Sequence, residues 1–167
     1  MTSARYHAGG AVVAAADAGA HRMLVAGGWD SHRQLLDSCE LYDAAADRWS
    51  LQETRLPQPM CCRAAPIGGG GAVLTAQWND KSNTRCALFD VRSSSPSWQR
   101  MASATSARRY HTVASVGDHS VVMLGGVDES NRTDTAQLYD ARADRWSERP
   151  VWRLPVVSGW HRAVLVD

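Results

Sequence analysis

Several features of nucleic-acid binders, membrane proteins and common enzymes are missing from this sequence. The 167 residues carry 18 Lys and Arg against 17 Asp and Glu, a formal net charge of +1. The chain therefore lacks the positive charge with which proteins neutralise nucleic-acid phosphates. No apolar run reaches the roughly 18 residues that a spanning helix needs. The G-x-S-x-G, H-E-x-x-H and phosphate-loop motifs are absent as well. We expect no nucleic-acid partner and no membrane span.

Cysteine is scarce, and its spacing suits neither a metal site nor a redox pair. The four cysteines form no C-x-x-C motif; they are Cys39, Cys61, Cys62 and Cys86. In an extended segment the adjacent Cys61 and Cys62 would point to opposite faces, so they could not share one metal ion easily. We expect free thiols in a reducing compartment, and hence a cytoplasmic protein. Residues 1–20 weakly resemble a secretory signal, but Asp17 interrupts their apolar part.

What the sequence does contain is an internal repeat. At 44% hydrophobic and 21% charged residues, the composition is that of an ordinary globular domain. Residues 41–50, LYDAAADRWS, return almost unchanged as LYDARADRWS at residues 138–147, and a weaker copy, ALFDVRSSSPSW, lies between them at residues 87–98. The tryptophans of the three copies, Trp49, Trp98 and Trp146, are 49 and 48 residues apart. A fixed period of this length indicates a repeat architecture.

Each repeat is predicted to form four short strands. The second strand ends in a glycine pair, Gly27-Gly28 in the first unit and Gly125-Gly126 in the third, where a backbone without Cβ atoms can turn sharply. The third strand contains Tyr42, Phe89 or Tyr139, and the fourth contains the tryptophan. The first strand starts at an aromatic–His pair, at residues 6–7, 110–111 and 160–161. DAAADRW is predicted to be a hairpin loop, because the middle copy replaces it with Ser and Pro.

This ordered set resembles the kelch-repeat family, whose period of about 50 residues fits better than the 40–45 of WD40 repeats. Arg108-Arg109-Tyr110-His111 is similar to the frequent R-x-x-H opening of the family. The resemblance implies an all-β fold, a partial kelch-type β-propeller with about three four-stranded antiparallel blades plus the first strand of a fourth. Within residues 1–167 the units are expected at about 5–52, 53–101 and 102–149, with a fourth starting at 154–167.

Two departures from the pattern lead to further expectations. Unit two has Ala76-Gln77 in place of the glycines and Phe89 in place of Tyr, which predicts a different backbone path and a less stable unit. Propellers usually close with about 4–8 blades, so three blades leave two apolar end faces open. The chain is therefore expected to be a fragment of a larger propeller or to associate with itself through its end blades.

Two enzyme-like interpretations compete with a structural one. Equivalent blade positions converge on one axis, so His7, His111 and His161 could together hold zinc or copper. Unit two has no His there, and we expect no metal and no cofactor. Some kelch-like propellers are sugar-active enzymes, either copper radical oxidases or neuraminate epimerases, and this remains the alternative function. An oxidase would need a spare tyrosine, whereas packing accounts for all four tyrosines here.

The favoured function is a protein-interaction module without enzymatic activity, which could be the recognition part of a larger adaptor. Loops on a rigid scaffold usually carry binding, and the loops after the glycine pairs and between the units are expected on one face. Aromatic and arginine side chains are enriched at interface hot spots. The candidate binding residues are Trp29, Arg33, Arg63, Trp78, Lys81, Arg108, Arg109, Asn131 and Arg132. The sequence names no partner.

Overall fold

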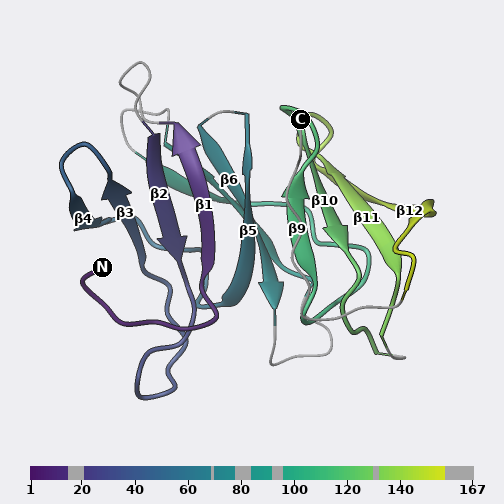
Figure 1. The fold of residues 1–167 in the computed structure, drawn as a ribbon, viewed down its shortest axis with the longest axis horizontal. Helices are drawn as coiled ribbons and strands as arrows, with labels where there is room; N and C mark the ends of the chain where they lie inside the picture. The colour runs from purple at the N-terminus through teal and green to yellow at the C-terminus, as the bar shows by residue number, and fades with distance from the viewer. Residues whose placement is uncertain (15–20, 69, 78–83, 92–95, 130–131, 157–167) are drawn as a thin grey trace.

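The described residues fold into three separate four-stranded antiparallel sheets (Figure 1). The computed structural model describes residues 1–14, 21–68, 70–77, 84–91, 96–129 and 132–156. Within these ranges the chain forms strands, turns and loops but no helix, so it holds no helix long and apolar enough to cross a membrane. The predicted all-β fold with four strands per unit is confirmed. Most of the expected fourth unit, from residue 157 onward, lies outside the described residues.

The strands of each blade follow one another in sequence and in space. Blade 1 contains β1 (Gly9–Ala14), β2 (His21–Ala26), β3 (Cys39–Asp43) and β4 (Arg48–Leu51). Blade 2 contains β5 (Cys61–Ile67), β6 (Gly71–Gln77), β7 (Cys86–Asp90) and β8 (Ser97–Arg100). Blade 3 contains β9 (Thr112–Ser115), β10 (Ser120–Leu124), β11 (Thr135–Asp140) and β12 (Arg145–Arg153). The first strands β1, β5 and β9 contact one another in turn, so the blades are arranged around their inner edges.

The repeated ten-residue motif encodes the hairpin between the third and fourth strands of a blade. In blade 1 the carboxylate of Asp43 accepts hydrogen bonds from the N–H groups of Ala45 and Ala46, which closes the turn. Asp47 then takes a left-handed conformation, with φ of 46°, and accepts a 2.7 Å hydrogen bond from the Tyr42 hydroxyl. Asp is among the few residues with a side chain that tolerate this conformation.

Blade 3 repeats this hairpin with the same atoms. Asp140 accepts from the N–H groups of Arg142 and Ala143, and Asp144 has φ of 43° and accepts from the Tyr139 hydroxyl at 2.9 Å. The motif recurs because its tyrosine and its two aspartates each have a defined bond to make. Phe89 of blade 2 has no hydroxyl and cannot make this hydrogen bond.

The glycine pairs turn the chain where it passes close to a neighbouring segment. Gly27 and Gly28 have φ of 63° and 91°, and a Cβ atom on Gly27 would lie 2.3 Å from the carbonyl oxygen of Met60. Blade 2 does not turn at this point, since β6 continues through Ala76 to Gln77 and pairs with β5 there. The different backbone path predicted for unit two is therefore confirmed.

The aromatic–His column predicted from the sequence is wrong by one residue. The hydrogen-bonded bridge that opens blade 1 joins Tyr6 to Trp29, and its counterpart in blade 3 joins Arg109 to Val127. Tyr6 is therefore equivalent to Arg109, and His7 is equivalent to Tyr110; these last two both have positive φ, 55° and 58°.

The real anchor of the repeat at this point is an arginine. Arg5 donates to the carbonyl oxygens of Gly27 and Ser38, as Arg108 does to those of Gly125 and Thr135. The two arginines hold the loop that follows each glycine pair.

The hydrophobic core lies between the blades. One cluster joins blades 1 and 2 and includes Leu24 and Leu41 from the first with Leu74 and Phe89 from the second. A second cluster joins blades 2 and 3 through residues such as Val73, Val121, Met123 and Trp146. Blade 2 therefore contributes to both clusters and is covered on both faces. This position argues against the expectation that unit two is the least stable, because burial on two faces offsets its irregular sequence.

Candidate functional site

One end of the molecule collects the loops that the sequence predicts to bind partners. In an antiparallel blade the second and fourth strands run in the same direction, so the loop after the second strand and the linker to the next blade emerge at the same end. These segments lie at the lower end in Figure 1. We define the loop face as the described residues of this end: 27–38, 52–60, 84–85, 101–111, 125–129 and 132–134.

The predicted binding residues are spread unevenly over this region. Arg33, Arg109 and Arg132 are exposed, and Trp29 is half-buried. The Arg109 guanidinium lies 5.9 Å from the ring centroid of Tyr110, within the range of a cation–π contact. Arg63 is half-buried and belongs to β5 rather than to a loop. Trp78, Lys81 and Asn131 lie outside the described residues.

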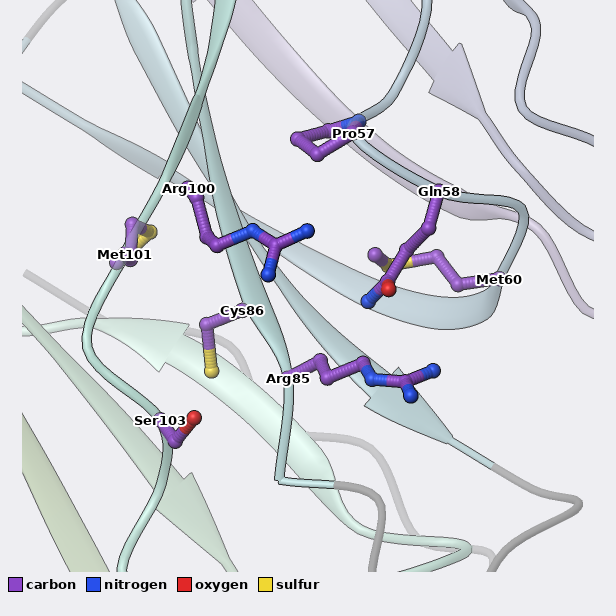
Figure 2. Close-up of a pocket in the computed structure, with 8 residues that line it drawn as sticks. All are labelled: Pro57, Gln58, Met60, Arg85, Cys86, Arg100, Met101 and Ser103. Carbon is purple, nitrogen blue, oxygen red and sulfur yellow. The ribbon is translucent and has the colours of Figure 1, made fainter.

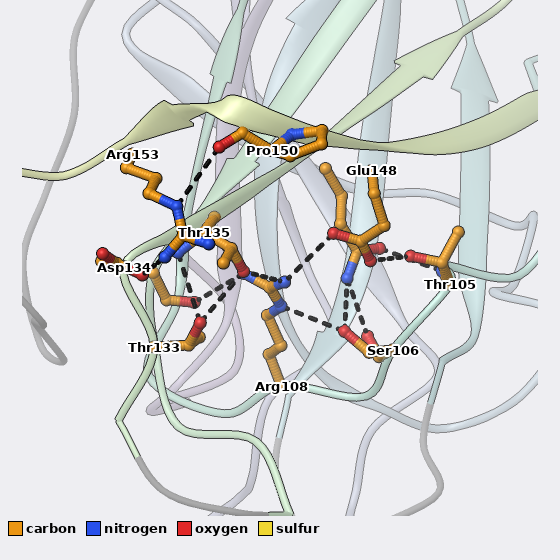
Figure 3. A network of polar contacts seen from close by, with 11 residues as sticks. Thr105, Ser106, Arg108, Thr133, Asp134, Thr135, Glu148, Pro150 and Arg153 are labelled. Atoms are coloured by element: carbon orange, nitrogen blue, oxygen red, sulfur yellow. Dashed lines mark hydrogen bonds and ion pairs between the residues drawn. The ribbon is translucent and has the colours of Figure 1, made fainter.

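Arg108 does not have the exposure that a surface contact needs. Its side chain is only 2% exposed. The guanidinium donates to the carbonyl oxygen of Thr135 at 2.7 Å, to the hydroxyl of Thr135 at 2.6 Å and to the hydroxyl of Ser106 at 3.2 Å (Figure 3). The Glu148 carboxylate lies 3.9 Å away and also accepts a hydrogen bond from Thr105. Arg108 has a structural role: it connects the segment between blades 2 and 3 to β11 and β12. We therefore remove it from the candidate binding residues.

Arg5 has the same role in blade 1, and it faces a buried acid. Its Nη2 lies 2.9 Å from Glu40, and the two side chains are 1% and 0% exposed. Glu40 also accepts hydrogen bonds from the Thr2 amide and hydroxyl and from the Ser3 amide. Burial acts to raise the pKa of Glu40, but these hydrogen bonds and Arg5 together hold it below its ordinary value.

A small pocket opens at the loop face beside the outer strands of blade 2 (Figure 2). Its volume is about 50 Å³. Its polar lining comes from Gln58, Arg85, Arg100 and Ser103, and its apolar lining from Pro57, Met60, Cys86 and Met101. Figure 2 shows both arginine side chains extending toward the side on which Gln58 lies. Arg85 and Arg100 are themselves exposed, whereas Met60, Cys86 and Met101 are buried beneath them.

This arrangement suits a small anionic group better than it suits catalysis. Two guanidinium groups beside an amide and a hydroxyl supply several donors for a carboxylate, and guanidinium pairs well with carboxylate oxygens. The Cys86 thiol at the base is a poor nucleophile, because burial raises its pKa to about 12. Burial likewise raises the pKa of Cys61 to about 11 and that of Cys62 to about 12.

Sequence reasoning missed Arg85 and Arg100. Both lie at strand ends in unit two, the unit whose repeat pattern is weakest, and neither belongs to a repeated motif. Their shared position depends on the pairing of β7 with β8, in which Arg100 is opposite Ala87. In the sequence, the only indication that these two arginines belong to a binding site was the composition of the loops next to them.

The two described members of the histidine column, His7 and His111, lie in different surroundings. His7 is exposed, whereas His111 is 1% exposed and has Thr75 Oγ1 2.7 Å from its Nε2 and the Arg108 carbonyl oxygen 3.0 Å from its Nδ1. The third member, His161, lies outside the described residues. Among the residues that are described, no group of three or more His, Cys, Asp or Glu side chains could hold a metal ion.

Comparisons with known proteins agree with this architecture. The family model described as Kelch motif matches residues 14–54, which include the first glycine pair and the first hairpin motif. The curated relatives bear the same name. Kelch repeat-containing protein kel-10 of Caenorhabditis elegans is 28% identical over 130 residues, and Kelch-like protein 25 of Xenopus tropicalis is 25% identical over 126 residues. The chain is a kelch-repeat protein.

The kelch relatives are much longer than this chain. A third, Kelch repeat and BTB domain-containing protein F47D12.7 of Caenorhabditis elegans, is 30% identical over 137 residues. The matches cover 73%, 75% and 73% of this chain but only 22%, 21% and 22% of the three relatives, in the order given. Among solved structures, the structure of YjhT matches with a TM-score of 0.70 at 15% identity, over 93% of this chain and 54% of that one. The fold is therefore a partial kelch-type propeller.

Proposed function

We propose that this kelch chain is a protein-interaction module that binds its partner through the loop face. The observation that supports this most directly is the pocket between Arg85 and Arg100, which joins donors to a buried apolar base at the end where the loops gather. The names of the relatives agree with such a role, since one is a Kelch repeat and BTB domain-containing protein and another, from Arabidopsis thaliana, is an F-box/kelch-repeat protein. By analogy, the chain is the recognition part of a larger adaptor.

The partner is proposed to present an acidic side chain. An Asp or Glu of the partner would enter the pocket and pair with Arg85 and Arg100, while its neighbours would contact Trp29 and the exposed Arg33 and Arg109. Arginine and aromatic side chains at a partly desolvated centre commonly supply most of the binding energy of an interface. The charges would also speed the encounter with an acidic surface.

A non-catalytic role fits the chemistry of the described side chains. The hydroxyls of Tyr42 and Tyr139 each donate to an aspartate of a hairpin, which is a structural use. The four cysteines are free and buried, which suits a reducing compartment such as the cytoplasm.

Peptide selection tests the proposal and does not require the partner to be identified first. A phage-displayed library of random peptides is panned on the purified chain, and the enriched peptides are synthesised and titrated. We expect the enriched sequences to share an Asp or Glu. Replacing both Arg85 and Arg100 with Ala should weaken binding at least tenfold, which corresponds to about 1.4 kcal/mol.

The matched control is Arg142→Ala. Arg142 is an exposed arginine in the β11–β12 hairpin, at the opposite end of the blades from the loop face. This variant has the same loss of charge per site and should bind like the parent chain. Peptides without an acidic residue, or binding that depends on Arg142 as much as on the pocket arginines, would contradict the proposal.

A further inference from the structure

Three Ser and Thr side chains in the linker between blades 2 and 3 have different surroundings. Thr105 donates to a carboxylate of β12, and Ser106 accepts hydrogen bonds from Arg108 and Gln137. These two hydroxyls hold the linker in place. Ser103 is exposed, and its hydroxyl makes no hydrogen bond to any other residue that the structure describes. It is therefore available for modification without the loss of a structural bond.

The backbone of the linker places Ser103 beside Arg85. Two backbone hydrogen bonds tie the start of the linker to the start of β7. They run from the Met101 amide to the Cys86 carbonyl oxygen, at 3.3 Å, and from the Ala104 amide to the Thr84 carbonyl oxygen, at 2.8 Å. The short stretch between the two donors contains Ser103, and the stretch between the two acceptors contains Arg85. Ser103, Arg85 and Arg100 accordingly line the same pocket (Figure 2).

The sequence before Ser103 fits a pattern that many protein kinases recognise. These kinases select a Ser or Thr that follows an arginine by three residues, because acidic side chains of the kinase pair with the guanidinium. Four residues of this chain fit the pattern: Ser95, Ser103, Thr112 and Thr135. Ser95 lies outside the described residues, Thr112 is 6% exposed, and the Thr135 hydroxyl accepts a hydrogen bond from Arg108. Among the three that are described, only Ser103 is exposed.

The arginine of this pattern also lies where a kinase can reach it. Arg100 is exposed and is the last residue of β8. In the four-stranded sheet of blade 2, β8 is an outermost strand and pairs with β7 alone. The chain that leads to Ser103 is therefore already extended and lies at an outer edge of the blade, which suits an enzyme that binds its substrate segment in extended form.

We propose that Ser103 is a phosphorylation site and that its phosphate binds in the pocket with Arg85 and Arg100. An arginine-directed protein kinase transfers the γ-phosphoryl group of ATP. The bond between the γ-phosphorus and the bridging oxygen breaks, Ser103 Oγ bonds to that phosphorus, ADP leaves, and the hydroxyl proton passes to a base of the kinase. The phosphate carries a charge of about −1.5 to −2 at pH 7 and accepts strong hydrogen bonds from guanidinium groups.

The charges around the pocket favour this pairing. The residues that line it bring two positive charges and no negative one. The Cys86 thiol at the base is neutral, because burial raises its pKa to about 12. Next to the linker, the Asp144 carboxylate accepts from the Ala102 amide at 3.0 Å and from the Tyr139 hydroxyl at 2.9 Å. These two bonds hold Asp144 at its hairpin.

Phosphorylation should close the pocket to an acidic partner. A phosphate on Ser103 and a carboxylate of the partner need the same guanidinium donors, and the pocket volume is only about 50 Å³. The modification would thus end the binding that the loop face provides. This consequence rests on the proposed function, whereas the modification itself and its pairing with the arginines do not.

The site is tested by incubating the purified chain with ATP and the catalytic subunit of cyclic-AMP-dependent protein kinase. Tandem mass spectrometry of the tryptic peptide 101–108 should place the phosphate on Ser103 and not on the other two hydroxyl residues of that peptide. Arg100→Ala should slow the modification about tenfold, the effect of losing one charge-assisted contact. Arg142→Ala should be modified like the parent chain. A peptide 101–108 without phosphate on Ser103, or an Arg100→Ala variant modified at the parent rate, would overturn the proposal.

The pairing is measured separately, on chain synthesised with phosphoserine at position 103, so that kinase recognition has no part in the result. Positive charges favour the doubly charged phosphate, so phosphorus NMR should give a second pKa below the ordinary value of about 6. Arg85→Ala should return the pKa toward that value, and Arg142→Ala should not. An ordinary pKa, or one that does not respond to Arg85→Ala, would show that the phosphate does not bind in the pocket.

The effect on partner binding uses the acidic peptides selected on the unmodified chain. Phosphoserine at position 103 should weaken their binding about tenfold or more, and phosphatase treatment should restore it. Equal affinity for the modified and unmodified chains would contradict occupation of the pocket by the phosphate. Failure of any acidic peptide to bind the unmodified chain would contradict the proposed function alone, because the two measurements above use no partner.

Discussion

Buried charge is handled differently at equivalent positions of blades 1 and 3. Arg5 faces the carboxylate of Glu40, whereas the residue equivalent to Glu40 in blade 3 is the neutral Gln137, which is also 0% exposed. Gln137 accepts from the Thr105 amide and donates to Ser106, so it is satisfied by the linker rather than by Arg108. Two solutions to one packing problem therefore exist within the same chain.

The blade 1 solution predicts a strongly coupled pair. Glu40→Gln copies blade 3, but it leaves Arg5 buried without a counter-charge, and Arg5→Met leaves the acid unpaired. Each should lower the free energy of unfolding by about 3 kcal/mol, since removing one partner of a buried pair is costly. The double variant should lose less than the sum. Urea denaturation of the four proteins measures the coupling, and simple additivity would contradict it.

The same pair predicts a pH dependence. The pKa of Glu40 in the folded protein lies below its ordinary value. Its stabilising contribution is therefore complete above the unfolded pKa of about 4.3 and is lost as the pH falls through the folded pKa. The difference in stability between the parent chain and Glu40→Gln should shrink toward zero on acidification. A difference that stays constant down to about pH 3 would show that the charge of Glu40 is not the cause.

The hydroxyl of Tyr139 gives a milder effect at the residue scale. Tyr139→Phe removes the hydrogen bond to Asp144 and gives blade 3 the residue that blade 2 has at this position, Phe89. It should lower the free energy of unfolding by about 1 kcal/mol. Tyr42→Phe removes the same bond from a more exposed site and should cost less. Equal losses in chemical denaturation would indicate that burial does not strengthen the bond.

At the scale of elements, the recurring tryptophan is the residue that joins one blade to the preceding one. Trp146 is 5% exposed against blade 2, whereas Trp49 of blade 1 is half-buried and lies in one row with the exposed Met23. Trp146→Ala should therefore lower the unfolding free energy by about 3–5 kcal/mol, and Trp49→Ala by no more than about half as much. Equal losses would mean that contacts within the blade dominate.

Local stability should follow the position of a blade rather than the regularity of its sequence. In β6 the residues Ala72, Val73 and Leu74 are all 0% exposed, because blades 1 and 3 cover both sides of blade 2. The amides of β6 should exchange with solvent more slowly than those of β2, whose blade has an open face. Hydrogen exchange measures this, and faster exchange in β6 would favour the weaker middle unit expected from the sequence.

The sequence predicted the elements that repeated letters encode. Tyr42, Asp43 and Trp49 belong to one hairpin with local bonds, so the same spelling returns wherever the hairpin does. Contacts between distant segments were harder to foresee. The aromatic–His alignment was wrong because it followed similar residue types, whereas the equivalent positions are set by the arginine that precedes them. From its sequence position Arg108 was expected to be a loop residue, because its partner Thr135 is 27 residues away in the chain. The pocket arginines lie together only through the strand pairing of blade 2.

At the scale of the whole molecule, an exposed apolar row in blade 1 should make stability depend on protein concentration. Val12 and Met23 lie in cross-strand register with Tyr42 and Trp49 and are 54% and 39% exposed. Exposed apolar patches favour association, and a folded form that associates gains stability with protein concentration by mass action. The Tm of the parent chain should therefore rise as the protein is concentrated, while that of Met23→Arg, which puts a charge in the row, should stay constant. Ala45→Arg should behave like the parent, because it adds the same charge in the exposed β3–β4 hairpin. A Tm of the parent chain that is independent of concentration would show that this row does not mediate association.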